Sequence, residues 1–190
     1  MKTGRKILTL VTLFFAIHVP AQSLNTIKSF NISIHGTSTL HDWESKATKA
    51  EWKAPLTLDA SKHLSLANAE LKIPVTGIQS EHGRIMDGKT YEAFNSEKNP
   101  YITFKMKTFT QKIVGNDILL AVEGDLTMNG FTNLIMLSVI GKTLPGGDIQ
   151  FTGSRSLKMT DYKMKPPTAM MGTIKVGDEI TVKFDLTISK

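Results

Sequence analysis

Apolar and polar residues alternate along several segments of the chain. The last segment is the clearest case, because its apolar and polar residues occupy every second position without a break from residue 180 to residue 189. Residues 30–35 and 101–107 repeat the pattern. Side chains on a β-strand point alternately to its two faces. The alternation therefore predicts strands with one face in an apolar core and the other in water.

Turn-forming residues separate these segments. The predicted strands cover residues 27–40, 46–54, 64–75, 101–112, 117–128, 131–143, 148–159 and 175–188. Asn129-Gly130 lies between two of them and is a strong signal for a two-residue hairpin. Short strands joined by regular turns are typical of an antiparallel sandwich or barrel. About eight strands with one apolar face each favour an all-β, up-and-down antiparallel barrel, which leaves no exposed edge.

Two segments lack the alternation. Residues 81–95 are predicted to form a loop and a short helix, near residues 85–95, that lies over the barrel. Residues 161–176 contain Pro166-Pro167 and Met170-Met171 and are predicted to form a long loop. No internal repeat or linker divides the chain, so we expect one domain over residues 22–190.

The first 21 residues have the order of a secretory signal peptide. Basic residues at positions 2, 5 and 6 precede an apolar run over residues 7–19, and Val19-Pro20-Ala21 is a typical cleavage site. The run is short for a membrane span, although an uncleaved anchor is the alternative. We expect the mature protein to begin at Gln22 and to lie in the periplasm or outside the cell. The chain has no cysteine, which excludes lipid attachment to a cysteine and disulfide bonds.

The charge of the mature chain argues against a nucleic-acid partner. Removal of the three basic residues of the leader lowers the formal net charge from +6 to about +3. No dense block of lysine and arginine remains. No second long apolar run follows, so we expect a protein that does not span the membrane. A homodimer is compatible with the sequence.

Several motifs in a fixed order resemble the YceI-like family of exported lipid-binding proteins. The first is "LKIPVTGIQS", residues 71–80, followed by the spacing of Phe94, Pro100, Ile102 and Phe104. The second is "VEGDLTMNGFTN", and the third is the closing "VGDEITVKFDL". The resemblance implies a lipocalin-like barrel of about eight strands around an elongated apolar cavity that takes polyisoprenoid chains. Members of the family are not established enzymes.

This sequence departs from the family pattern in two places. Arg84-Ile85-Met86-Asp87 replaces the usual Arg-Asp-x-His run, and the first predicted strand ends in His41-Asp42-Trp43. Both departures fall where we expect the mouth of the cavity or the helix. The resemblance therefore implies binding of the isoprenoid chain and does not specify the head group.

Inward-facing residues are the candidate contacts of an apolar ligand. The cavity set is Phe30, Ile32, Ile34, Ile102, Phe104, Met106, Leu120, Val122, Leu126, Phe151, Val182, Phe184 and Leu186. The mouth and head-group set is Arg84, Met86, Tyr91, Phe94, Arg155 and Met170. Periodicity does not distinguish a filled barrel from a hollow one, and methionines serve in either. The resemblance alone favours a hollow barrel.

Arg155 is unusual because it falls in the inward register of an otherwise apolar strand. A buried guanidinium without a partner is costly. Three arrangements remove that cost: an internal salt bridge, a bulge that turns the side chain outward, or a contact with a polar ligand head such as a phosphate or quinone oxygen.

His41-Asp42 is the strongest candidate for chemistry, but the pattern does not favour catalysis. Adjacent residues on a strand point to opposite faces, and His35 lies about 20 Å away along a straight strand. We therefore predict local hydrogen bonds at a strand end beside Trp43 and no metal site. A contribution to the ligand mouth is the alternative. No Gly-x-Ser-x-Gly elbow or cysteine nucleophile is present.

Together these observations favour binding, storage or transport of a long isoprenoid lipid, either a quinone side chain or a polyprenyl phosphate, in the cell envelope. We expect no enzyme activity and no cofactor besides that ligand. A lipid-modifying hydrolase or isomerase with His41 or Asp42 as general base is one alternative. A filled barrel that binds proteins through exposed aromatic residues is another, with Trp43, Trp52 and Tyr101 as candidates.

Overall fold

The computed structural model describes residues 25–81 and 83–190, so the predicted signal peptide lies outside the described residues. The long antiparallel strands of the main sheet are β1 (Ile27–Ser38), β8 (Tyr101–Val114), β9 (Asp117–Met128), β10 (Phe131–Thr143), β11 (Ile149–Lys158) and β13 (Ile174–Ile188). Its shorter strands are β2 (Trp43–Ala47), β3 (Glu51–Lys53), β6 (Glu70–Pro74) and β7 (Ile78–Ser80). One α-helix, α1 (Arg84–Ala93), accompanies them in the described residues. The all-β class and the short helix are confirmed.

The strand pairings form a ring. The strands β2 and β3 are consecutive pieces of one bent segment, and β6 and β7 are pieces of another, separated by the 3-10 turn η1 (Val75–Gly77). These segments pair with each other through β3·β6 and β2·β7, and the Thr48 amide donates to the Gly77 carbonyl (2.8 Å) between the two ladders. β2 also pairs with β1, and β6 with β8. The order around the ring follows the chain, which is the up-and-down barrel predicted from the alternation.

The hairpin at Asn129-Gly130 forms as the sequence predicts. Both residues have positive φ, 49° and 77°, and the flanking Met128 and Phe131 are paired. Positive φ at both central residues defines the hairpin turn whose twist matches that of the strands. Asparagine and glycine adopt this conformation at low cost, so the local sequence determines the register of β9 against β10.

A β-bulge at Lys107 changes the inward register of β8. The pairing with β9 shifts between Met106 and Thr108. Before the bulge Phe104 and Met106 face inward, and after it Phe109 packs against the core cluster that includes Ile118. One extra residue exchanges the two faces of a strand.

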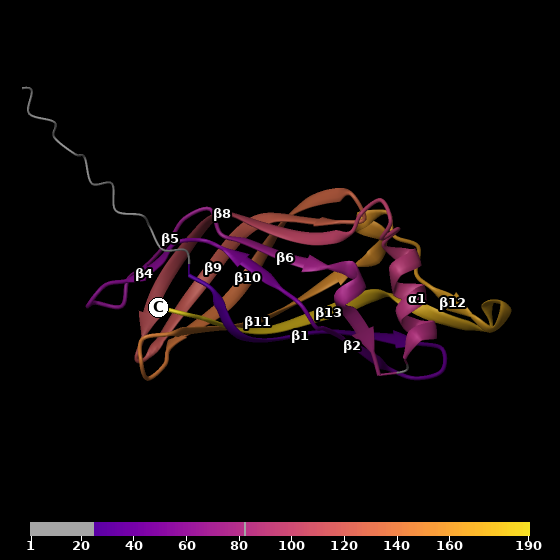
Figure 1. Cartoon of the computed structure of the whole chain (residues 1–190), viewed down its shortest axis with the longest axis horizontal. Helices are drawn as coiled ribbons and strands as arrows, with labels where there is room; N and C mark the ends of the chain where they lie inside the picture. The colour runs from indigo at the N-terminus through magenta and orange to yellow at the C-terminus, as the bar shows by residue number, and fades with distance from the viewer. Residues whose placement is uncertain (1–24, 82) are drawn as a thin grey trace, which may run out of the picture.

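Each end of the barrel is covered by a small element (Figure 1). A hairpin of β4 (Leu56–Leu58) and β5 (Leu64–Leu66) lies at one end, and α1 and the two-residue strand β12 (Thr168–Ala169) lie at the other. Leu56 and Leu64 are buried in the cluster at the hairpin end. Around α1, the buried cluster includes Val75 and Phe94. The space between the two clusters holds the candidate site.

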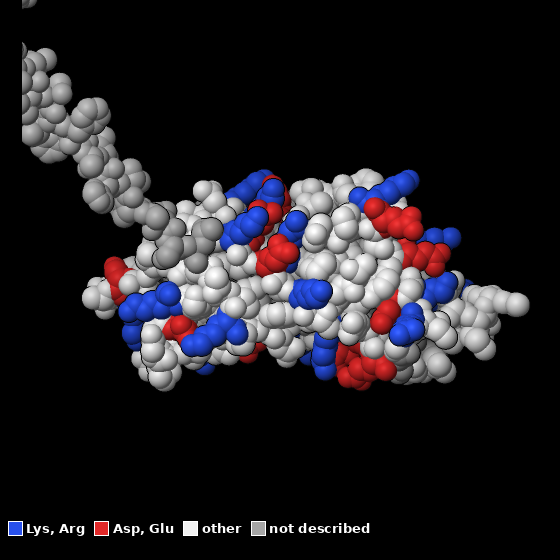
Figure 2. Space-filling model, viewed as in Figure 1, with Lys and Arg blue, Asp and Glu red and all other residues white. Residues whose placement is uncertain are grey.

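The surface shows charges of both signs. Basic and acidic side chains are interspersed on the face in Figure 2, and no extended basic surface lies on that face. Within residues 25–81 and 83–190, no helix has the length and apolar character that spanning a bilayer requires.

Candidate functional site

An apolar cavity of about 230 Å³ lies inside the barrel. The inward-facing set predicted from the sequence lines it, with one exception; these residues are Ile32, Ile34, Ile102, Phe104, Met106, Leu120, Val122, Leu126, Phe151, Val182, Phe184 and Leu186. Phe30 is the exception and is corrected here. Its side chain packs against the buried cluster of Ile32, Ala47 and Leu186, so it belongs to the wall and not to the lining. Contact of the lining residues with a ligand stays a prediction.

Two glycines leave room for aromatic rings against the wall. A Cβ atom on Gly124 would lie 2.5 Å from Cζ of Phe104, and one on Gly153 would lie 2.5 Å from Cζ of Phe184. Each ring therefore occupies the place that a neighbouring side chain would take. This arrangement keeps two large rings close to the backbone of the next strand and leaves space along the barrel axis.

Both tryptophans of the chain line the cavity. The ring of Trp43 packs over Gly36, and its Nε1 donates to the Thr37 carbonyl (3.1 Å). Trp52 is different, since its buried Nε1 has no hydrogen-bond partner in the described part of the chain. The alternative of a protein-binding surface named both tryptophans as candidates, and neither is exposed. Of the three aromatic candidates for a protein-binding surface only Tyr101 is exposed, with Lys72 Nζ 3.6 Å from its ring centre.

One face of α1 closes part of the cavity. Met86, Lys89, Thr90 and Ala93 line it, and their spacing of three and four residues places them on one side of a helix. Phe94, which directly follows the helix, lines the cavity too. Met86 and Phe94 were predicted from the sequence; Lys89, Thr90 and Ala93 were not, although helical periodicity counted from Met86 selects them.

Tyr91 anchors the helix and does not line the cavity. Its hydroxyl lies 3.0 Å from the Thr76 carbonyl oxygen and 3.1 Å from that of Ile78, and it can donate to either. Burial, and secondarily the charge of Asp87, raises the pKa of Tyr91, so the hydroxyl stays a donor at neutral pH. The prediction that Tyr91 lies at the mouth is corrected to a structural role.

Arg84 and Met170 also lie outside the lining. Arg84 is exposed at the first residue of α1, two positions before the inward-facing Met86. Met170 is 72% exposed in the 3-10 turn η3 (Met170–Gly172), where both methionines have positive φ. Met171 beside it is exposed as well, so the prediction that Met170 lies at the mouth is not supported by its position.

The wall of the barrel is incomplete between β10 and β11. The ladder of these strands runs from Thr143–Ile149 to Val139–Gly153 and stops there, whereas each strand stays paired with its other neighbour. The 3-10 turn η2 (Met159–Tyr162) folds against this opening. Arg155 lies on β11 just beyond the last pair; it lines the cavity and is also exposed. Of the arrangements expected for Arg155, no internal salt bridge is found among the described residues, and no bulge interrupts the pairing of β11 with β13 around it; the side chain reaches solvent through the opening.

His41 and Asp42 form part of an exposed turn. The Nδ1 atom of His41 lies 2.6 Å from the Asp42 carbonyl oxygen, and the Ser38 hydroxyl donates to the His41 carbonyl (2.8 Å). The predicted local hydrogen bonding beside Trp43 is confirmed. Neither residue lines the cavity, so the geometry does not support a general base acting there. No three histidine, aspartate or glutamate side chains in the described residues gather in a way that could hold a metal ion.

Comparison with solved structures shows the same fold in other bacterial proteins. The domain described as a polyisoprenoid binding domain from Saccharophagus degradans superposes with a TM-score of 0.69 at 13% identity, over 89% of this chain and 99% of that one. BcnA from Burkholderia cenocepacia superposes with a TM-score of 0.65 at 20% identity, over 83% of this chain and 95% of that one. The YCEI protein of Campylobacter jejuni superposes with a TM-score of 0.56 at 17% identity, over 96% of this chain and 94% of that one.

At these identities the structural likeness shows the fold alone. A search of curated proteins found no significant match. A model of the YceI-like domain, however, matches residues 16–188, which is most of the sequence. The motifs, the barrel and this match agree, and the chain belongs to the YceI-like family.

Proposed function

We propose that this protein binds a long isoprenoid lipid in the barrel and stores or carries it in the cell envelope. The observation that carries the proposal is the cavity, which is enclosed by the strands and lined almost wholly by apolar side chains. The printed description of the Saccharophagus degradans domain, a polyisoprenoid binding domain of the same fold, supports it.

Burial of the chain supplies the affinity. Removal of a CH₂ group from water stabilises by about 0.8 kcal/mol, so a five-carbon isoprene unit contributes about 4 kcal/mol before other costs. Loss of freedom of the chain and of the protein offsets much of this gain. Methionines such as Met106 and Met128 line the cavity and adapt their shape to a branched chain.

Export to the periplasm or the outside of the cell is part of the proposal. It rests on the basic and apolar order of the first 21 residues and on Val19-Pro20-Ala21. N-terminal sequencing of the protein from a cell envelope should begin at or near Gln22. A mature envelope protein that begins at Met1 would contradict the cleavage.

The two tryptophans give a direct assay, because both line the cavity and the chain has no other. Lipid-stripped protein is titrated with polyprenols of increasing length, and tryptophan fluorescence reports occupancy. We expect the affinity to rise with each isoprene unit until the cavity is full and then to level off. Straight-chain alcohols of equal carbon number are the control. Equal affinity for both series would remove the isoprenoid preference, and no fluorescence change with either would contradict lipid binding in this cavity.

A further inference from the structure

A lateral opening lies between β10 and β11. β10 pairs with β9 over nearly its whole length, and β11 pairs with β13 from Ile149 to Lys158. Between β10 and β11 themselves no pairing continues past Val139–Gly153. Residues 131–138 and 154–158 therefore diverge. A surface pocket occupies this opening and is lined from both sides, by Ile135 of β10 and by Arg155 and Leu157 of β11.

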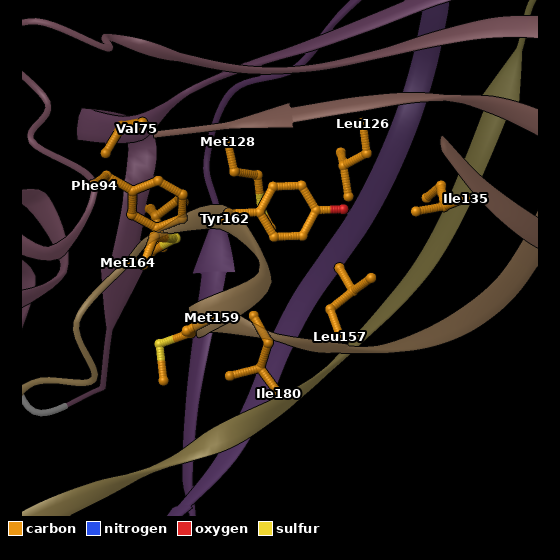
Figure 3. Packing of buried hydrophobic residues seen from close by; sticks show 11 residues of the cluster. Val75, Phe94, Leu126, Met128, Ile135, Leu157, Met159, Tyr162, Met164 and Ile180 are labelled. Carbon is orange, nitrogen blue, oxygen red and sulfur yellow. The ribbon is translucent and has the colours of Figure 1, made fainter. Parts of the chain in front are cut away.

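Tyr162 fills one end of the opening. Its ring lies among the buried side chains of Leu126, Ile135 and Leu157, and Figure 3 shows its hydroxyl directed away from Phe94, toward the side of Ile135. The residue is 1% exposed, and no group in the described residues is placed in hydrogen-bonding geometry with its hydroxyl. The Asn133 side chain, whose amide donates to the Asp161 carbonyl, lies close enough to act on the pKa of the phenol without satisfying its proton. A buried hydroxyl without a partner is costly and rare, so this one calls for a group that the protein itself does not supply.

The backbone around Tyr162 is held in place from both neighbouring sides. The Asn129 side-chain amide lies 3.2 Å from the Tyr162 carbonyl, and that of Asn133 donates to the Asp161 carbonyl (2.9 Å). On the other side, the Asp178 carboxylate accepts from the Thr160 hydroxyl (2.7 Å) and the Thr160 amide (2.9 Å). The orientation of the phenol is thus set before any ligand arrives, which lowers the cost of binding.

Arg155 supplies the second donor. It lines the apolar cavity and the surface pocket alike, and it is exposed, so water and not an ion pair within the described residues surrounds its guanidinium. Burial raises the pKa of Tyr162, while the Asn133 side chain and the positive charge of Arg155 act in the opposite direction. Both residues line the surface pocket in the opening between β10 and β11. Guanidinium groups only donate, and the buried phenol has a proton to donate.

We propose that Arg155 and Tyr162 form a subsite for the head group of the lipid, which takes acceptor oxygens of a quinone carbonyl or a phosphate in the opening between β10 and β11. This inference rests on the proposed function, since the chain of the same lipid would fill the cavity. The cation at the α1 end is a weaker candidate because Lys89 already pairs with Glu92 (3.2 Å). The other orphan donor, Trp52 Nε1, is single and uncharged.

The test compares lipids with and without a head group on three variants. Tyr162→Phe removes the hydroxyl, Arg155→Met removes the guanidinium, and Arg84→Met is the matched control, because Arg84 lies outside the cavity lining and the opening. The probes are a quinone with an isoprenoid tail, a polyprenyl phosphate and an isoprenoid hydrocarbon such as squalene. Tryptophan fluorescence and thermal melting of the stripped protein are measured for each variant.

We expect Tyr162→Phe and Arg155→Met each to weaken the binding of the quinone, of the polyprenyl phosphate or of both by about tenfold, which corresponds to the loss of one hydrogen bond. Squalene should bind them as it binds the unchanged protein, and Arg84→Met should change nothing. The lipid that loses more identifies the natural head group. Tyr162→Phe should melt at the same temperature as the unchanged protein or higher, because it removes an unpaired hydroxyl.

Two outcomes separate this inference from the proposed function. If both variants bind every lipid as tightly as the unchanged protein does, the subsite is wrong while lipid binding stands. If the unchanged protein binds neither squalene nor the headed lipids, the proposed function itself fails.

Discussion

Enlargement of Val182 tests whether the barrel is hollow. Val182 lies on β13, lines the cavity, and is paired with Ile34 on one side and Arg155 on the other. In Val182→Phe the added atoms enter the cavity if that space is free in the stripped protein. In a closely packed core the same change would force neighbouring side chains and backbone apart at a cost of about 1–3 kcal/mol.

The two cases differ by a measurable amount. For a domain of this size, 1 kcal/mol corresponds to a change of about 2–4 °C in melting temperature. Overpacking would therefore lower the melting temperature of stripped protein by about 2–12 °C, whereas a hollow barrel should keep it within about 2 °C. Lipid binding also distinguishes the two cases, because only in the hollow barrel does the added ring take space from the ligand. A ring that displaces one isoprene unit removes about 4 kcal/mol of gross burial, and even a third of that amount weakens binding about tenfold.

Lys183→Phe is the matched control, since Lys183 is exposed and is the next residue on the same strand. Melting of each stripped variant is followed by calorimetry, and bound lipid is extracted and weighed against protein. We expect Val182→Phe to melt normally and to carry less lipid or a shorter chain, and Lys183→Phe to carry the normal load. A strongly lowered melting temperature together with an unchanged lipid load would refute the hollow cavity.

Three further changes test other parts of the structure. Gly153→Ala should lower the melting temperature by about 2–12 °C, because its Cβ would lie 2.5 Å from Phe184 and 2.8 Å from a backbone oxygen. Gly88→Ala is the control, since open space surrounds Gly88 in α1, and it should be neutral or stabilising. Equal effects of the two changes on the melting temperature would refute the packing argument. Hydrogen bonds from Thr160 lower the pKa of Asp178, so its stabilisation is present above about pH 3.9, the unfolded value, and is lost as the pH falls through the lowered pKa. Melting curves should therefore separate Asp178→Ala from the unchanged protein at pH 7 and converge in acid; a constant difference would contradict this. His41→Ala should leave circular dichroism and lipid load unchanged, and a lipid-modifying activity abolished by it would overturn the binding assignment.

The barrel could be predicted from the sequence because its determinants are local. Alternation identifies strands, and the Asn129-Gly130 turn sets a register. The inward residues follow from the same period, so every residue predicted for the cavity except Phe30 lines it, including Val182. Other lining residues, such as Ile135 and Leu157, were not predicted. The bulge at Lys107 could not be predicted from the sequence, because a single extra residue exchanges the two faces of β8 without a visible change in its composition.

The opening between β10 and β11 could not be predicted, since it depends on contacts between distant segments. The side chains of Asn129 and Asn133 hold the turn before Lys163, and neither asparagine differs locally from an ordinary strand or turn residue. The sequence marked Arg155 as an inward-facing cation but gave no sign that the wall ends beside it. The inward position of Trp52 was missed because β3 is too short to show a period.

The central claim is that the cavity holds a long isoprenoid lipid. Native mass spectrometry of the protein isolated from a cell envelope, followed by organic extraction and mass analysis of the extract, tests it most directly. The account predicts a complex heavier than the mature chain by one ligand, and an extract that contains a molecule built of repeated five-carbon units with an oxygen-bearing head. The claim would be contradicted if the protein carried only straight-chain lipids, or if it were isolated from the envelope without a ligand and then bound no added polyprenol.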